Sequence, residues 1–341
     1  MEPTLLQTIW FLLIAVLLSV YAILDGFDFG VGILSLMTKG KEDKRLLMNS
    51  IGPVWDGNEV WLLAGGGSIF AAFPFVYATV FSSFYLAVYL LLLALFFRAI
   101  SFEFRGRVDS EKWGKFWEYS FGFGSLFPPI LLGVAYGNII RGINLNESRI
   151  FTGSFFDLLN PYAIVIGLLA LTMCLMQGAI YLTFKTEGEL QAKFEGIATK
   201  AWIAFVLLYF ISTIYTFFEA RFHFQGITSL LWFWVVFIVF LVSLVMIPVA
   251  LKSKNNKRAF LFSSVTIASM IGLSAIGLFP KMVPSKINLN YSLTVMNASS
   301  TERTLVTMLI IALIGMPFVI IYTVYIYRVF KGKTRLTEES Y

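Results

Sequence analysis

The sequence predicts an all-α, polytopic membrane protein with nine transmembrane helices. The 341-residue chain is 58% hydrophobic and only 13% charged. Its mean hydropathy of +0.80 is far above the values of soluble globular domains. Apolar runs of about 20 residues, the length that crosses a bilayer core, recur along the whole chain. Little sequence remains for a soluble part, so we expect one integral-membrane domain over residues 1–341.

Nine apolar runs define the predicted spans. They cover residues 9–36, 54–73, 77–100, 116–139, 163–184, 201–218, 227–251, 259–279 and 305–330. No Lys or Arg precedes the first run, and this run is too long for the core of a signal peptide, so we expect it to be retained as a helix. In the second span, AGGGS at residues 64–68 predicts close helix packing or a bend. Ser299 and Glu302 predict a capping box before the ninth span.

The distribution of basic residues predicts the orientation of the chain. Nineteen of the 26 Lys and Arg residues lie in residues 37–53, in the connections after the third, fifth and seventh spans, and in the C-terminal tail. Six lie in the other connections, and Arg98 lies inside a span. Cytoplasmic loops carry the basic excess, so we expect an outer N-terminus and a cytoplasmic C-terminus. The net charge of +6 therefore reflects membrane orientation, and nothing indicates nucleic-acid binding.

The supply of soft metal ligands is small. Cys174 is the only cysteine and lies inside the fifth span, and His223 is the only histidine and lies in an outer connection. Haem iron and most transition-metal sites use imidazole or thiolate ligands. We therefore expect no cofactor in this chain. If the protein takes part in electron transfer, another subunit must hold the redox centres.

Five charged residues in the first three spans are the candidate functional residues: Asp25, Asp28, Asp56, Glu59 and Arg98. An ionisable group at the centre of a span costs about 2.5–3.5 kcal/mol, and such groups usually mark an ion route or a buried pair. At about 1.5 Å per residue, Asp25 lies roughly 16 Å from the inner end of its helix, near the bilayer midplane. The other four lie closer to the cytoplasm. The set predicts a polar ladder confined to the cytoplasmic half of the membrane.

Two interpretations of the ladder remain open. Arg98 could pair with one carboxylate while the others are hydrogen-bonded structural groups, because a buried charge requires a partner. Alternatively, the carboxyls could conduct protons inward by exchanging them with one another. We favour conduction, because a ladder that reaches only the midplane suits an internal consumer of protons better than transport across the membrane.

Several long motifs resemble one known family. LDGFDFGVG in the first span, WDGNEVW in the second and the segment ending in FFR in the third occur in order with KTEGEL and LFPKMVPS further along. Together they resemble subunit II of the cytochrome bd-type quinol oxidases of bacterial cytoplasmic membranes. The resemblance implies a partner, subunit I, which carries haems b and d, or b only, and the quinol-oxidising loop. It implies a complex that oxidises quinol and reduces O2 to water with protons from the cytoplasm.

The resemblance also implies roles for particular residues. Asp56, Arg98 and Asp25 match family positions associated with a proton route toward the oxygen-reducing haem. Asp28 and Glu59 join this set because of their depth and helix face. Some members of the family bind a haem or a structural quinone in this subunit, and some carry a further small single-helix subunit. Contact with membrane lipid is expected for any member.

Two alternatives belong to other functional classes. A self-sufficient ion-coupled transporter would use midplane carboxylates and interrupted helices in both halves of the chain. Here the acids and glycines cluster only in the first hundred residues, which counts against it. In a purely structural scaffold, the carboxylates would be locked in ion pairs.

Overall fold

The computed structural model describes residues 2–336, and helices dominate this part of the chain. The helices are α1 (Leu5–Leu36), α2 (Lys41–Ile51), α3 (Trp55–Ala72), α4 (Pro74–Ser83), α5 (Tyr85–Phe104), α6 (Glu111–Arg141), α7 (Phe155–Leu158), α8 (Pro161–Lys185), α9 (Gly188–Glu219), α10 (Leu231–Lys252), α11 (Asn256–Leu278) and α12 (Glu302–Val329). Strands β1 (Lys281–Val283) and β2 (Leu293–Thr294) pair antiparallel between α11 and α12. The predicted all-α, polytopic class is confirmed.

Eight of the described helices are long and apolar enough to cross a membrane. They are α1, α5, α6, α8, α9, α10, α11 and α12. Each coincides with one of the predicted apolar runs. The second predicted run corresponds to α3, which has 18 residues but carries Asp56, Asn58 and Glu59 in its first two turns. These polar side chains lower its hydropathy, so composition alone does not mark α3 as a span.

Two local expectations differ from the structure. The third predicted span, residues 77–100, is divided between α4 and α5, because the helix is interrupted at Phe84 (φ −103°, ψ 18°). The predicted capping box at Ser299 is wrong. Thr301 is the N-cap of α12, where its hydroxyl accepts from the Thr304 amide, while Ser299 Oγ accepts from Gln7 Nε2 at 2.8 Å. A contact with the distant helix α1 thus occupies the serine.

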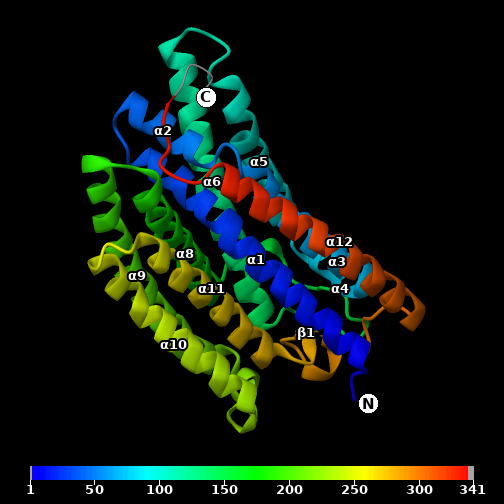
Figure 1. Cartoon of the computed structure of the whole chain (residues 1–341). Coiled ribbons are helices and arrows are strands. Elements are labelled where there is room, and N and C mark those ends of the chain that lie inside the picture. The colour runs from blue at the N-terminus through cyan, green and yellow to red at the C-terminus, as the bar shows by residue number, and fades with distance from the viewer. Residues whose placement is uncertain (1, 337–341) are drawn as a thin grey trace.

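The long helices run between two ends of the bundle (Figure 1). At one end, Trp10 Nε1 donates to the Leu305 carbonyl oxygen at 3.0 Å, so α1 and α12 begin together beside β1 and β2. At the other end, Lys185 Nζ donates to the Phe330 carbonyl oxygen at 2.7 Å, so α8 and α12 finish together near α2. We call these the β1 end and the α2 end. Helix α3 runs antiparallel to α1 and α12. Its last residues lie at the β1 end, where the Ser300 amide, just before α12, donates to the Ala72 carbonyl oxygen at 2.8 Å.

Helix α1 lies at the centre and packs against α3, α6, α8, α11 and α12. Its approach to α8 is close enough that the backbones nearly touch at Gly30 and Gly178. A Cβ added at Gly30 would lie 2.0 Å from the Cys174 carbonyl oxygen, and one added at Gly178 would lie 2.6 Å from Gly30 Cα. Helices α1 and α8 are therefore in close contact at these two glycines. In AGGGS, Gly65 faces Leu18 of α1, whereas a Cβ at Gly66 would meet nothing within 4 Å.

Candidate functional site: a buried charge cluster

Four of the five predicted residues converge between α1, α3 and α5. Helix α1 presents Asp25 and Asp28 from one face, and α5 presents Arg98; these three side chains have no exposed surface. Arg98 Nη2 lies 2.9 Å from Asp25 Oδ1 and 3.9 Å from Asp28 Oδ2. Arg98 Nη1 lies 3.8 Å from Glu59 Oε2 of α3. We call Asp25, Asp28, Glu59 and Arg98 the charge cluster.

Helix packing fixes the position of Arg98. A Cβ added at Gly124 of α6 would lie 2.9 Å from the Arg98 amide nitrogen and 2.7 Å from the Ala94 carbonyl oxygen. Only glycine therefore allows α6 to support α5 at this height. On the other side of α1, the contact of Gly30 with α8 holds the turn next to Asp28. The acids and the arginine thus project from helices whose spacing is set by glycines.

Burial decreases along α3 toward the α2 end. The Glu59 side chain is 24% exposed, whereas Asp56, one turn earlier, is exposed. Within residues 2–336, Asp56 makes no ion pair, so the structure does not bring it into the charge cluster. Asp56, Glu59 and the two aspartates of α1 nevertheless form a series from the surface to the fully buried interior.

Aromatic rings enclose the arginine. Its Cζ lies 4.5 Å from the centre of the Phe29 ring and 5.9 Å from that of Trp55. Trp55 stacks on Phe102, with centroids 5.0 Å apart and planes 2° apart. We call Phe29, Trp55 and Phe102 the aromatic wall. A cation held over ring faces is attracted by about 2 kcal/mol when it is desolvated, and the rings also exclude water from the ion pairs.

Two neutral residues of the site were not predicted. Asn58 Nδ2 donates to Asp28 Oδ2 at 2.8 Å, and Tyr327 of α12 donates its hydroxyl to Asn58 Oδ1 at 2.9 Å. Asn58 lies between the two predicted acids in WDGNEVW and is 1% exposed. Its position in the motif is a signal that a search restricted to charged residues passes over. Tyr327 has no such signal, because its partner lies 269 residues earlier.

The charge cluster has hydrogen-bonding capacity left over. Among the residues that the structure describes, Asp25 Oδ2, Asp28 Oδ1 and the Nε and Nη1 atoms of Arg98 have no hydrogen-bond partner. Three carboxyls surround a single guanidinium. One guanidinium balances the charge of one carboxylate, so protons on the other carboxyls would keep the buried site near neutrality. Such a site can hold and exchange protons.

A second group of ion pairs lies at the α2 end. Glu118 of α6 accepts from Arg105 Nη2 at 2.7 Å and lies 3.2 Å from Lys44 Nζ of α2. The Glu118 side chain is 10% exposed. Two cations, one from α2 and one from the end of α5, contact this single carboxylate, so the group fastens both segments to α6.

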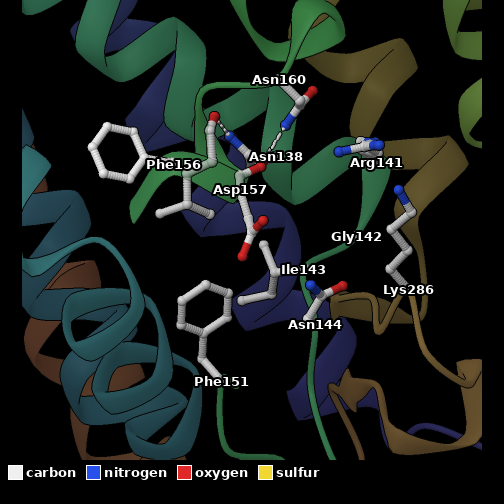
Figure 2. Close-up of a pocket in the computed structure, with 11 residues that line it drawn as sticks. Asn138, Arg141, Gly142, Ile143, Asn144, Phe151, Phe156, Asp157, Asn160 and Lys286 are labelled. Atoms are coloured by element: carbon white, nitrogen blue, oxygen red, sulfur yellow. Dashed lines mark hydrogen bonds between the residues drawn. The ribbon is translucent and has the colours of Figure 1, made fainter. Parts of the chain in front are cut away.

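Figure 2 shows a pocket of about 290 Å³ at the β1 end, between α6, α7 and the segment after β1. Two of its amides are engaged in the fold, since Asn160 Nδ2 donates to Asn138 Oδ1 at 2.9 Å and Asn138 Nδ2 donates to the Leu158 carbonyl oxygen at 2.7 Å. Its cations Arg141 and Lys286 have acids beside them, including Glu219, 2.7 Å from Arg141 Nε. We assign no ligand to this pocket.

The one histidine and the one cysteine lie in different parts of the described structure. His223, in the short 3-10 helix Arg221–Phe224, donates from its Nε2–H to the Ile140 carbonyl oxygen at 2.9 Å. Cys174 is buried in α8. Within residues 2–336, no group of three or more His, Cys, Asp or Glu residues is arranged to hold a metal ion.

Comparison with known proteins gives consistent matches. The model of the family described as cytochrome bd terminal oxidase subunit II matches residues 6–330. The chain is 33% identical over 366 residues to cytochrome bd-I ubiquinol oxidase subunit 2 of Escherichia coli K12, covering 98% of this chain and 96% of that protein. It is 37% identical over 330 residues to cytochrome bd ubiquinol oxidase subunit 2 of Bacillus subtilis 168, covering 96% of each. The fold matches a chain of the bd oxidase from Geobacillus thermodenitrificans with a TM-score of 0.81 at 16% identity, over 96% of this chain and 99% of that one.

Proposed function

The chain belongs to the cytochrome bd terminal oxidase subunit II family, and from that premise we propose that its charge cluster carries protons from the cytoplasm toward the site of oxygen reduction. As a member of this family it is a multi-pass protein of the bacterial membrane and a subunit of a quinol:O2 oxidoreductase. The relatives are oxidase subunits, so a self-sufficient transporter is not favoured.

The graded burial of the carboxyls is the observation that carries the proposal. Asp56 is exposed at the α2 end, Glu59 is partly covered, and Asp25 and Asp28 are fully buried around Arg98. Reduction of O2 to water consumes protons, and a row of exchangeable groups that leads inward from one surface can supply them. Arg98 would stabilise whichever carboxyl is ionised as protons pass.

The proposed direction requires the α2 end to face the cytoplasm. We propose that the chain has nine spans, which are the eight long apolar helices and α3, whose polar first turns lower its hydropathy. We also propose an outer N-terminus and a cytoplasmic C-terminus. The basic excess in the connections at the α2 end supports this orientation. Cys174 is buried, so an impermeant reagent does not reach it, and single cysteines can be placed on either side. In intact cells, an impermeant thiol reagent should label N146C but not K254C; the reverse pattern would contradict the orientation.

We further propose that this subunit binds no haem and that subunit I holds the haems, b and d or b only. The chain's one histidine donates its Nε2–H to a backbone carbonyl oxygen, and its one cysteine is buried within α8. Exposed apolar side chains cover α12, where Leu305 is the only buried residue of the helix. Such faces suit contact with subunit I, a small single-helix subunit or membrane lipid.

The test compares carboxyl-to-amide variants in the assembled complex. We expect Asp25→Asn and Asp56→Asn to slow quinol-driven oxygen consumption by roughly tenfold or more, with the complex assembled and its haem absorption unchanged. Asp109→Asn, in an exposed loop at the same end, is the matched control and should behave as the parent. If both test variants consumed oxygen at the parental rate, the proton-path proposal would fail and the carboxyls would have only a structural role.

A further inference from the structure

From the Tyr327–Asn58–Asp28 hydrogen-bond chain we infer that Tyr327 is a positioning residue for the proton path, because it fixes the orientation of the Asn58 amide that holds Asp28. This inference rests on the proposed function. Tyr327 belongs to α12, and the two residues it controls belong to α3 and α1. The last long helix of the chain would thereby set the geometry of carboxyls in the first.

The chemistry of the amide gives the hydroxyl its importance. An asparagine side chain donates from Nδ2 and accepts at Oδ1. In the structure, Nδ2 lies 2.8 Å from the Asp28 carboxylate oxygen, and Oδ1 accepts from the Tyr327 hydroxyl at 2.9 Å. When Asp28 is ionised, rotation of the amide by half a turn would place Oδ1 against a carboxylate oxygen, which repels it. The tyrosine donor therefore stabilises the rotamer that Asp28 requires.

Burial makes this orientation matter. Asn58 is 1% exposed, and the Asp28 side chain has no exposed surface. Asp28 lies 3.9 Å from Arg98 Nη2, which is beyond hydrogen-bond distance, and among the described residues its Oδ1 has no hydrogen-bond partner. The Asn58 amide is thus the hydrogen-bond donor that the structure gives this carboxylate, and a misoriented amide would remove it.

The burial of Tyr327 also separates it from the exposed tyrosines of the same helix. Its neighbours Tyr322 and Tyr325 are 59% and 61% exposed, whereas the Tyr327 hydroxyl turns inward to α3. Tyr325→Phe is therefore a matched control, since it also removes a tyrosine hydroxyl from α12 but leaves the hydrogen bond to Asn58 in place.

The experiment uses the assembled oxidase and a double-mutant cycle. We expect Tyr327→Phe to lower quinol-driven oxygen consumption by about three- to tenfold, the range of one lost hydrogen bond, and to shift its pH dependence by about half a unit or more. In an Asn58→Leu background the same change should have no further effect on either quantity. Tyr325→Phe should leave both unchanged. Haem content and subunit stoichiometry verify assembly.

The possible results separate this inference from the function on which it rests. Parental turnover and pH dependence in Tyr327→Phe, or an equal loss in the Asn58→Leu background, would overturn the positioning role. If Asp28→Asn keeps full turnover while Tyr327→Phe still acts through Asn58, the coupling stands and the proton path through Asp28 fails. If Asp28→Asn is slow while Tyr327→Phe is normal, the positioning inference alone fails.

Discussion

Arg98 Nη2 lies 2.9 Å from Asp25 Oδ1, and neither side chain has exposed surface. Desolvation of two such charges is expensive, and their attraction offsets it only with good geometry and further hydrogen bonds. Here Arg98 also faces Asp28 and Glu59 and lies over the Phe29 ring. A charge site with several partners for one cation is poorly explained as a simple stabilising pair. Substitution of its members one at a time can separate a loss of stability from a loss of proton transfer.

Removal of the cation should destabilise the chain. Arg98→Gln leaves Asp25 and Asp28 buried without it, and breaking a buried pair from one side typically costs about 3–5 kcal/mol. We expect the purified complex to unfold at a lower thermal midpoint, which is measured by tryptophan fluorescence. The double variant Arg98→Gln/Asp25→Asn should recover part of that loss while oxygen consumption stays low. A double variant as unstable as the single one would contradict the pairing.

Glu59 should matter for turnover more than for stability. Its side chain is 24% exposed and lies 3.8 Å from Arg98 Nη1, which places it between the surface and the buried aspartates. We expect Glu59→Gln to slow oxygen consumption by roughly tenfold or more with little change in thermal midpoint. Glu103→Gln is the control, because Glu103 is exposed and its ion-pair partner, Arg107, is exposed as well. Equal activity of the two variants would place Glu59 outside the path.

The contact between α1 and α8 should tolerate no side chain at Gly30. A Cβ there would lie 2.0 Å from the Cys174 carbonyl oxygen, so the two helices would have to separate. Overpacking of this kind costs about 1–3 kcal/mol, and we expect Gly30→Ala to lower the thermal midpoint and the yield of assembled complex. Gly196→Ala in α9 is the control, because a Cβ there meets nothing within 4 Å. An unchanged midpoint in Gly30→Ala would contradict the close packing.

Sequence reasoning identified the charged members of the site for a simple physical reason. Ionisable residues are rare in apolar runs, so Asp25 and Arg98 stand out without any knowledge of tertiary contacts. Asn58 and Tyr327 are neutral, and their contacts join segments far apart in the chain, so nothing local marks them. The exposure of Asp56 could not be predicted either, because helical spacing brings it near Glu59 but does not say which neighbouring helix covers each residue.

The same limit applies to the fold. Hydropathy predicted the long apolar helices, whereas the break at Phe84 and the cap at Thr301 depend on local geometry and on contacts with other helices. Ser299 was a reasonable N-cap by spacing, but its hydroxyl accepts from Gln7 of α1. Tertiary contacts of this kind override local signals at helix ends.

His223 predicts a pH dependence of stability at the β1 end. Burial lowers the pKa of His223 from its ordinary 6.5 to about 4, although its hydrogen bond with the Ile140 carbonyl oxygen opposes the shift. Between these two values the unfolded chain binds a proton that the folded chain does not. The stabilisation is therefore complete above pH 6.5 and is lost as the pH falls toward 4, by up to about 3 kcal/mol at about 1.4 kcal/mol per pKa unit.

We expect the thermal midpoint of the parent to fall more steeply between pH 6.5 and 4 than that of His223→Gln, which cannot titrate. Carboxylates that titrate in the same range are common to both proteins, so the difference between the two curves isolates the histidine. Parallel curves would mean that His223 titrates alike in the folded and unfolded chains.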